Sequence, residues 1–223
     1  IWGALLYGGQ CVLFPERLPV MELVEATMMR HRVTSVFLTT SLFNEVVDKA
    51  PGALRQLRTV ITGGEVVSVA HVRKALAALP DTTIVHAYGP TECTTFATCG
   101  AIERHLPEGI ATLPIGRPLA RTQIYFLDDE FSPVPDGMIG ELCVGGEGVA
   151  IGYLRRPDLT AEKFIPDPFS GIPGARLYRT GDLGRRLADG QIDFQGRFDR
   201  QIKIRGFRVE LGEIEAAVLE QPG

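Results

Sequence analysis

Two short segments of this sequence combine carboxylates and hydroxyls with glycine, and their side chains could carry chemistry. The first is Tyr-Gly-Pro-Thr-Glu at residues 88–92, and the second is Tyr-Arg-Thr-Gly-Asp-Leu at residues 178–183. In each segment, glycine allows the backbone to approach a ligand closely beside a carboxylate. A hydroxyl and a carboxylate at the end of a strand suit a phosphate and its Mg²⁺, and an aspartate in a glycine turn suits a sugar diol. Together the two segments predict a site for ATP.

Simpler interpretations compete with this one. Taken alone, residues 88–92 are more typical of a helix N-terminus capped by Pro-Thr-Glu, and only the second segment shifts the balance towards a ligand site. A further glycine-rich stretch, residues 145–152, is neither GxGxxG nor a P-loop, since no Gly-Lys-Ser/Thr follows. We interpret that stretch as a glycine-rich loop between β-strands and not as a phosphate site.

The elements that must position these segments differ between the two halves of the chain. Residues 1–107 alternate helical patterns with short apolar strands at 33–38, 59–62 and 84–85, and Ser68 is a candidate N-cap. Such alternation predicts parallel strands whose ligands gather at their carboxyl ends. Residues 108–198 are richer in proline and glycine, with strand candidates at 123–127, 141–144 and 191–194. They predict a β-rich, barrel-like subdomain, followed in residues 199–223 by a further strand at 201–204 and the beginning of a helix marked by Leu211, Ile214 and Val218.

Composition narrows the possible functions. The 223 residues are 45% hydrophobic with a net charge of −4, and the basic residues are scattered, so we expect no nucleic-acid partner. No apolar run reaches the roughly 18 residues that span a bilayer, which predicts no membrane segment. The four cysteines form no CxxC, which favours the cytoplasm over an oxidising compartment. The chain begins without Met and stops within a helical pattern, so we expect it to be a piece of a longer protein.

Four segments in the same order resemble the core motifs of amino-acid adenylation domains of nonribosomal peptide synthetases, in the adenylate-forming superfamily. They are residues 86–92, 140–154, 178–183 and 196–215. The resemblance implies an α/β fold with a parallel-rich sheet, a β-rich subdomain, and the start of a small C-terminal α+β subdomain. It implies domain limits of 1–107, 108–198 and 199–223, with the last part truncated.

The resemblance also implies roles for individual residues. Thr91 would contact phosphate and Glu92 would bind Mg²⁺, and these two form the expected catalytic pair. Asp199 matches a hinge about which the C-terminal subdomain turns. The residues expected around ATP are Gly64, Glu65, Tyr88, Gly89, Thr91, Asp182, Phe194 and Arg197. Taken singly, Phe194 could be a core aromatic, Arg197 a surface charge and Asp199 a solvated turn residue.

The family pattern further implies a pocket for the substrate side chain. Its walls would be Phe37, Ile61, Gly63, Ala87, Thr95 and Phe96. No charged residue is present in this set, so a charged substrate would lose solvation without gaining a partner. The expected substrate is therefore an aliphatic amino acid of the Val or Ile type. Ordinary core packing is the competing interpretation for Phe37 and Ile61.

The implied reaction joins an amino acid to AMP with release of pyrophosphate, and then transfers the aminoacyl group to a phosphopantetheine thiol on a carrier domain. Peptidyl carrier and condensation domains would be the partners. The family's phosphate loop and amino-group aspartate lie before Ile1, and its catalytic lysine lies beyond Gly223, so we expect this chain alone to be inactive. The alternatives are an acyl- or aryl-CoA synthetase, a luciferase-like enzyme, and a non-catalytic nucleotide-binding module.

Overall fold

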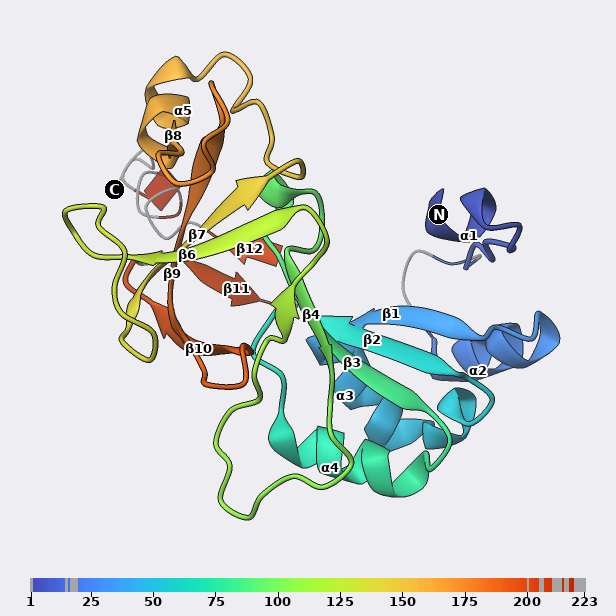
Figure 1. Cartoon of the computed structure of the whole chain (residues 1–223). Coiled ribbons are helices and arrows are strands. Elements are labelled where there is room, and N and C mark those ends of the chain that lie inside the picture. Colours follow the sequence, from blue (N-terminus) through green and yellow to red (C-terminus); the bar gives the residue numbers. More distant parts are fainter. Residues whose placement is uncertain are drawn as a thin grey trace.

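The computed structural model describes residues 2–14, 16, 20–199, 201–204, 207–209, 214, 217 and 218. Two separate β-sheets dominate these residues, and Figure 1 shows them side by side. Among the described residues, no helix is both long and apolar enough to cross a membrane.

The first sheet has five strands in the order β1-β2-β3-β4-β5, and β1, β2 and β3 are parallel. The last two strands run antiparallel to their neighbours. Its strands are β1 (Ser35–Thr39), β2 (Thr59–Gly63), β3 (Thr83–Tyr88), β4 (Thr98–Ala101) and β5 (Arg117–Pro118). The three strands predicted in residues 1–107 are confirmed as β1, β2 and β3. Strands β4 and β5 were not predicted, because they are short and rich in small residues or proline.

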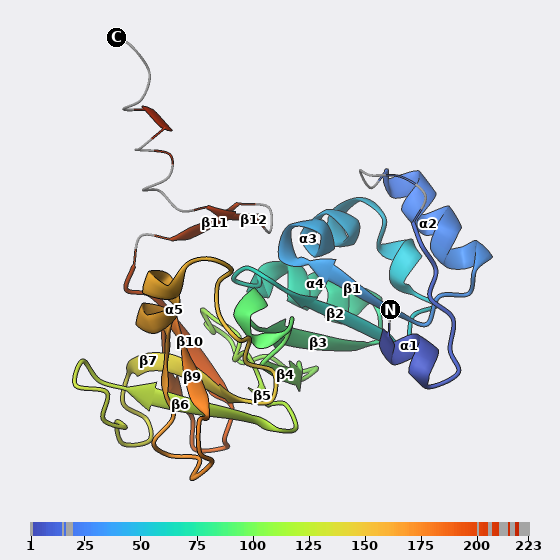
Figure 2. The ribbon, with the colours of Figure 1, turned by 90° about the horizontal axis from the view of Figure 1, so that it is seen from above.

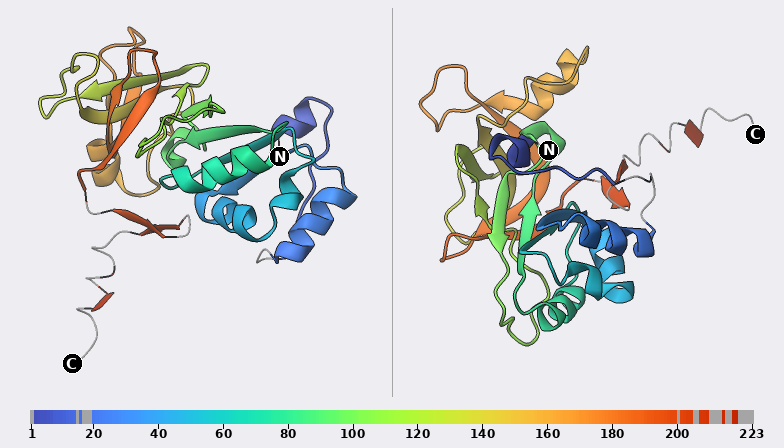
Figure 3. Two further views of the ribbon diagram at one scale, coloured as in Figure 1. Left: turned by 90° about the horizontal axis from the view of Figure 1, so that it is seen from below. Right: turned by 90° about the vertical axis from the view of Figure 1, so that its right-hand side faces the viewer.

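Helices cover one face of this sheet, as the left-hand view of Figure 3 shows from below. These helices are α2 (Met21–Arg30), α3 (Thr40–Lys49), η1 (Pro51–Leu54) and α4 (Val69–Ala78), whereas α1 (Trp2–Leu6) lies on the other side of the sheet in Figure 1. Alternate strand residues such as Leu38, Val60 and Ile84 point towards the helices and form one buried apolar core with them. The predicted N-cap is confirmed, since the Ser68 side chain accepts a hydrogen bond from the His71 backbone N–H.

The second sheet is antiparallel, runs in the order β10-β9-β7-β6, and forms a half-barrel. Its elements are β6 (Thr122–Leu127), β7 (Gly140–Gly146), α5 (Pro157–Lys163), β8 (Phe164–Pro166), β9 (Arg176–Arg186) and β10 (Ile192–Arg197). Strand β8 pairs with β9 outside the main order. Inward side chains such as Ile124, Leu142, Tyr178 and Ile192 build a second buried core. This sheet confirms the expected β-rich region.

One element differs from the sequence-based expectation. We expected Asp182 in a glycine turn, but residues 178–183 lie in the middle of the 11-residue strand β9. Gly181 has a φ of +75°, and the pairing of β9 with β7 shifts register between Glu141 and Cys143. The segment is therefore a β-bulge, which needs the same left-handed glycine as a turn.

A two-stranded sheet of β11 (Ile202–Ile204) and β12 (Phe207–Val209) follows β10. Figure 2 shows this hairpin beyond the edge of the half-barrel. It confirms the strand predicted at residues 201–204. The helix predicted after Leu211 falls largely outside the described residues.

Candidate functional site

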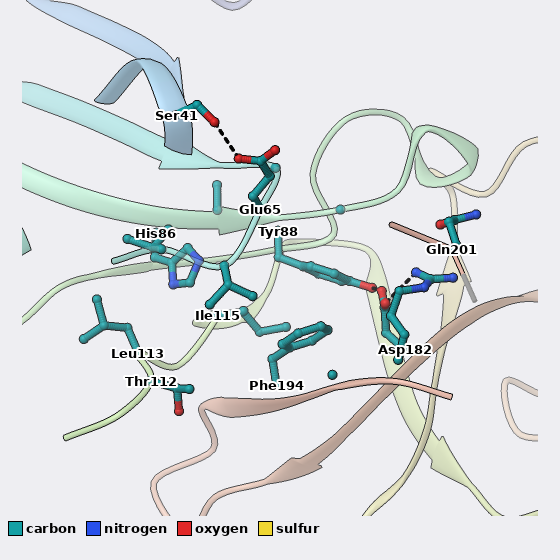
Figure 4. A pocket seen from close by; sticks show the side chains of 17 residues that line it. Ser41, Glu65, His86, Tyr88, Thr112, Leu113, Ile115, Asp182, Phe194 and Gln201 are labelled. Atoms are coloured by element: carbon teal, nitrogen blue, oxygen red, sulfur yellow. Dashed lines mark hydrogen bonds and ion pairs between the residues drawn. The ribbon is translucent and has the colours of Figure 1, made fainter. Parts of the chain in front are cut away.

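A pocket of about 730 Å³ lies where the carboxyl ends of β2 and β3 meet the half-barrel. Figure 4 shows that its walls come from both sheets. The residues that line it are Ser41, Gly64, Glu65, Val66, Val67, His86, Ala87, Tyr88, Gly89, Thr112, Leu113, Ile115, Asp182, Phe194, Gly196, Arg197 and Gln201. A pocket of several hundred cubic ångströms with a few polar groups has the size of a small-molecule site. The two polar–glycine segments, about 90 residues apart in sequence, both contribute to it.

The loop after β2 supplies one polar wall. Gly64 has a φ of +93°, a conformation that favours glycine, and the following Glu65 turns towards the pocket. Ser41 Oγ donates to Glu65 Oε2 at 2.7 Å, and Thr40 Oγ1 donates to the Glu65 carbonyl at 3.1 Å. The first residues of α3 therefore fix both the backbone and the carboxylate of this loop.

An aromatic pair joins the two sheets across the pocket. Tyr88, the last residue of β3, faces Phe194 of β10 with ring centroids 6.4 Å apart. The Tyr88 hydroxyl donates a hydrogen bond to Asp182 Oδ2. Burial, together with the charge of Asp182, raises the pKa of Tyr88 well above its usual value, so this hydroxyl stays protonated. Such aromatic surfaces suit the faces of a purine ring.

A chain of charges from the half-barrel completes the pocket. Arg197 Nη1 donates to Asp182 Oδ1 at 2.6 Å, and Arg197 Nε and Nη2 donate to the two oxygens of Asp199, each at 2.7 Å. The side chains of Asp182 and Arg197 are 6% and 16% exposed. Burial alone would raise the pKa of Asp199, but the hydrogen bonds and charge of Arg197 outweigh it and hold that pKa below its ordinary value. Asp199 therefore remains charged near neutral pH.

His86 lines the side of the pocket opposite Asp182 (Figure 4). Its Nδ1 lies 2.9 Å from the Pro114 carbonyl oxygen, which can only accept, so Nδ1 carries a proton and donates. Burial lowers the pKa of His86, although the Pro114 contact opposes this. The ring is therefore neutral at pH 7 and adds no positive charge to the pocket.

Thr91 and Glu92 lie beside the pocket and do not line it. They belong to a short helix, η2 (Thr91–Cys93), in which Thr91 is exposed and Glu92 is 7% exposed. Glu92 Oε1 accepts a hydrogen bond from the Tyr153 hydroxyl at 2.6 Å, and the Glu92 carbonyl accepts one from Ala150 N–H at 2.8 Å. The glycine-rich loop after β7 therefore packs on η2 and orients the Glu92 carboxylate.

A magnesium ion fits this arrangement only together with a ligand. In the described part of the chain, no group of three or more His, Cys, Asp or Glu side chains could hold a metal ion by itself. Mg²⁺ bound with a nucleotide usually takes one or two protein carboxylates and completes its shell with phosphate oxygens and water. The single carboxylate of Glu92 is compatible with that requirement.

The residues predicted for a side-chain pocket gather on the open face of the first sheet. The parallel register aligns Phe37 with Ile61 and aligns Gly63 with Ala87, so these four side-chain positions lie on the face opposite the helices. The ring of Phe96 contacts Phe37 edge-on, with centroids 5.3 Å apart. Among the six predicted residues, which also include Thr95 with a φ of +76°, only Ala87 lines the 730 Å³ pocket. The cluster therefore adjoins that pocket.

Reasoning from sequence missed several residues that shape the site. Glu141, Tyr153 and Thr180 were each within a recognised motif but had no assigned role, because their partners lie far away in sequence. Gln201 also lies within a recognised motif and a predicted strand but had no assigned role. Ser41 gave no signal, since a lone serine resembles any surface residue. Only the tertiary contacts identify them.

Comparisons with known proteins agree with this geometry. The sequence profile described as AMP-binding enzyme matches residues 1–154. The chain is 47% identical over 99% of its length to tyrocidine synthase 3 of Brevibacillus parabrevis, and 48% identical over 97% of its length to bacitracin synthase 1 of Bacillus licheniformis. Its fold matches that of holo-PA1221, an NRPS protein containing adenylation and PCP domains, with a TM-score of 0.91 and 36% identity.

The chain belongs to the AMP-binding enzyme family, and the resemblance to adenylation domains of nonribosomal peptide synthetases is confirmed. The match covers all of this chain and 38% of the PA1221 chain. It spans only 3% of tyrocidine synthase 3 and 4% of bacitracin synthase 1. The chain thus spans only a small part of the length of the synthetases that it matches.

Proposed function

We propose that this chain is the central part of an amino-acid-activating adenylation domain and carries its nucleotide pocket. The observation that supports this most strongly is the convergence of Glu65 and Tyr88 from the first sheet with Asp182, Phe194 and Arg197 from the half-barrel. The adenine would lie by Gly64, Glu65 and the two aromatic rings. Asp182, an acceptor only, would bind the ribose hydroxyls, and Arg197 would hold that carboxylate in place.

The proposed first step forms an aminoacyl adenylate. A carboxylate oxygen of the amino acid attacks the α-phosphorus of ATP, and the bond to the bridging oxygen breaks, so pyrophosphate leaves with the electron pair. The residues of this chain would chiefly position the two reactants, with Thr91 donating to a phosphate oxygen. Glu92, oriented by Tyr153, would hold Mg²⁺, which offsets the negative charge of the phosphates.

The proposed second step transfers the aminoacyl group to a carrier domain. The phosphopantetheine sulfur bonds to the acyl carbon and the bond from that carbon to the phosphate oxygen breaks, so AMP leaves with the electron pair and the thiol proton is released. Solved structures similar to this chain contain adenylation and PCP domains together, which supports such a partner. A condensation domain would use the product, and we expect the reaction in the cytoplasm. Asp199, fixed to Arg197 by two hydrogen bonds, is the proposed hinge for the rearrangement between steps.

We further propose an aliphatic substrate of the Val or Ile type. Phe37, Ile61 and Phe96 present apolar surface beside Gly63 and Ala87, and no charged residue occurs among the six proposed walls. One methylene changes binding in such pockets by only about 1–3 kcal/mol, so neighbouring aliphatics should also react.

The test is amino-acid-dependent ATP–pyrophosphate exchange by the full-length protein, with all common amino acids compared. We expect the highest exchange with Val or Ile. A strong preference for Asp or Lys would refute the proposed substrate, and exchange with no amino acid would refute the proposed function. Formation of acyl-CoA from fatty acids and CoA would instead identify an acyl-CoA synthetase. The 223 residues by themselves should show no exchange.

A further inference from the structure

The direction of the Asp182 side chain depends on the bulge in the middle of β9. Gly181 adopts a left-handed φ, and the pairing of β9 with β10 is also irregular, between Phe194 and Arg197. A regular strand would send alternate side chains to opposite faces without interruption. The bulge changes this alternation locally, and so it determines which way the Asp182 carboxylate faces.

A buried glutamate on the neighbouring strand supports this bulge. Glu141 of β7 is 8% exposed, and its Oε1 accepts a hydrogen bond from the Gly181 backbone N–H at 3.2 Å. Its Oε2 accepts from Arg179 Nη2 at 2.7 Å and from Arg179 Nε at 3.0 Å. The guanidinium carbon of Arg179 also lies 4.8 Å from the ring centroid of Phe131, which fixes the arginine further.

Thr180 supports the next peptide in a similar way. Its Oγ1 donates to the Leu142 carbonyl at 2.6 Å and accepts from the Asp182 backbone N–H at 3.0 Å. The backbone N–H groups of Gly181 and Asp182 are therefore both bound by side chains. Because buried N–H groups need a partner, these side chains stabilise a backbone shape that the regular ladder cannot.

The contacts of Glu141 require two acceptor oxygens. Both of its oxygens accept hydrogen bonds, one from a backbone N–H and the other from a guanidinium. A glutamine has one acceptor oxygen and one amide that only donates. Either orientation of a glutamine would place a donor against a donor, on Gly181 or on Arg179.

We propose that Glu141 is a positioning residue for nucleotide binding, acting through the Gly181 N–H to aim the Asp182 carboxylate into the pocket. Glu141 does not line the pocket, so it would not touch ATP itself. The inference rests on the proposed function, in which Asp182 binds the ribose hydroxyls. Loss of Glu141 should therefore weaken binding of nucleotides that carry those hydroxyls and leave other nucleotides unaffected.

The experiment compares the Glu141→Gln variant of the full-length protein with the unmodified protein. Equilibrium binding of ATP and of 2′,3′-dideoxy-ATP is measured by calorimetry. We expect ATP affinity to fall about tenfold, the size of one hydrogen bond to a charged group, and dideoxy-ATP affinity to stay within about twofold. An equal loss for both nucleotides, or no loss for either, would overturn the proposal.

Two further variants keep the test decisive. Glu147→Gln is the matched control, since Glu147 also pairs with an arginine, Arg121, at 3.0 Å, but both side chains are at least 70% exposed. It should change neither affinity. Arg179→Lys keeps a charge beside Glu141 without the two-bond fork, and it should reduce ATP affinity about threefold and spare dideoxy-ATP. If Glu141→Gln does not fold, this second variant decides, and unchanged ATP affinity in it would reject the proposal.

Failure of this inference can be distinguished from failure of the proposed function. If the unmodified protein lacks amino-acid-dependent pyrophosphate exchange, the function is wrong whatever Glu141 does. If exchange is present and Glu141→Gln retains full discrimination between the two nucleotides, only the role of Glu141 is wrong.

Discussion

The two sheets place their functional side chains by different means. In the first sheet, Glu65 and Tyr88 reach the pocket because parallel strands end there, and the helices on one face bury a continuous apolar core. In the half-barrel, Asp182 reaches the pocket from the middle of a strand, through a bulge. There the position depends on buried charges, since Asp182, Arg197 and Glu141 are all engaged in ion pairs.

This difference indicates where the site is most sensitive to substitution. The ends of the parallel strands in the first sheet are held by many apolar contacts, so a polar side chain there can be substituted without moving the backbone. A buried ion pair behaves differently, because removing one partner leaves the other charge desolvated and uncompensated, at a typical cost of about 3–5 kcal/mol. We therefore expect larger losses from substitutions in the half-barrel than in the first sheet.

The largest effect should follow Asp182→Ala. Removing the carboxylate deletes the proposed acceptor for the ribose and one partner of Arg197, so ATP affinity of the full-length protein should fall about 100-fold. Calorimetric titration measures it. Asp193→Ala is the control, because Asp193 pairs with Arg185 across the same two strands and does not line the pocket. Equal losses in both variants would show a general effect on the sheet.

Gly181→Ala should be the next most harmful change. A Cβ there would lie 2.5 Å from Asp199 Oδ2 and 2.7 Å from Arg197 Nη2, and the φ of +75° adds about 1–2 kcal/mol of strain. Gly190→Ala is the control, since its φ is +82° but its nearest neighbour would be 3.9 Å away. Both variants should unfold at lower temperature, and only Gly181→Ala should lose ATP affinity, by about tenfold. Unchanged affinity would mean that the bulge tolerates a side chain.

Tyr88→Phe tests the first sheet and should have a smaller effect. The ring remains, and Asp182 keeps its bond to Arg197, so losing the hydroxyl should weaken ATP binding about two- to tenfold. Tyr125→Phe is the matched control, because Tyr125 packs against Phe169 in the half-barrel, away from Asp182. A loss comparable to that of Asp182→Ala would contradict the contrast between the two sheets.

The reactivity of the cysteine thiols tests the burial of the half-barrel without a substitution and without measuring ATP binding. Burial, with the charge of Glu92, raises the pKa of Cys93 to about 12, and burial raises the pKa of Cys143 well above its usual value. At pH 8 the Cys93 thiolate fraction is then on the order of 1 in 10,000, and the thiolate is the reactive form. Iodoacetamide should label exposed Cys11 first, as peptide mass spectrometry would show. Prompt labelling of Cys93 would contradict its burial in the core of the half-barrel, and prompt labelling of Cys143 would contradict its burial in β7.

Sequence patterns predicted β1, β2 and β3 in the first sheet and β6, β7 and β10 in the half-barrel, and they missed β9, the strand that carries Asp182. Strands β1 to β3 are short apolar runs between helices, a pattern that can be recognised from the local sequence alone. Strand β9 carries polar residues at Arg179, Asp182 and Arg185, and its bulge interrupts the alternation that would reveal a strand. The glycine was recognised correctly as special, but a turn and a bulge require the same conformation.

A site residue was predictable where its motif implies a role in ligand binding, and not where it supports the site through tertiary contacts, even when a motif contains it. Asp182 and Tyr88 could be named because they occur in short ligand-like segments. The contact between their side chains, and the support from Glu141, depend on strand register that no local pattern encodes. The domain limits and the individual binding roles remain predictions.

In the proposed side-chain pocket, the close packing of β2 on β3 would constrain any attempt to alter which amino acid is accepted. A Cβ at position 63 would overlap the Ala87 carbonyl oxygen, so no larger residue fits there unless the two strands separate. Redesign for bulkier or smaller substrates would therefore have to vary Phe37, Phe96 or Ile61, and Gly63 would have to stay unchanged.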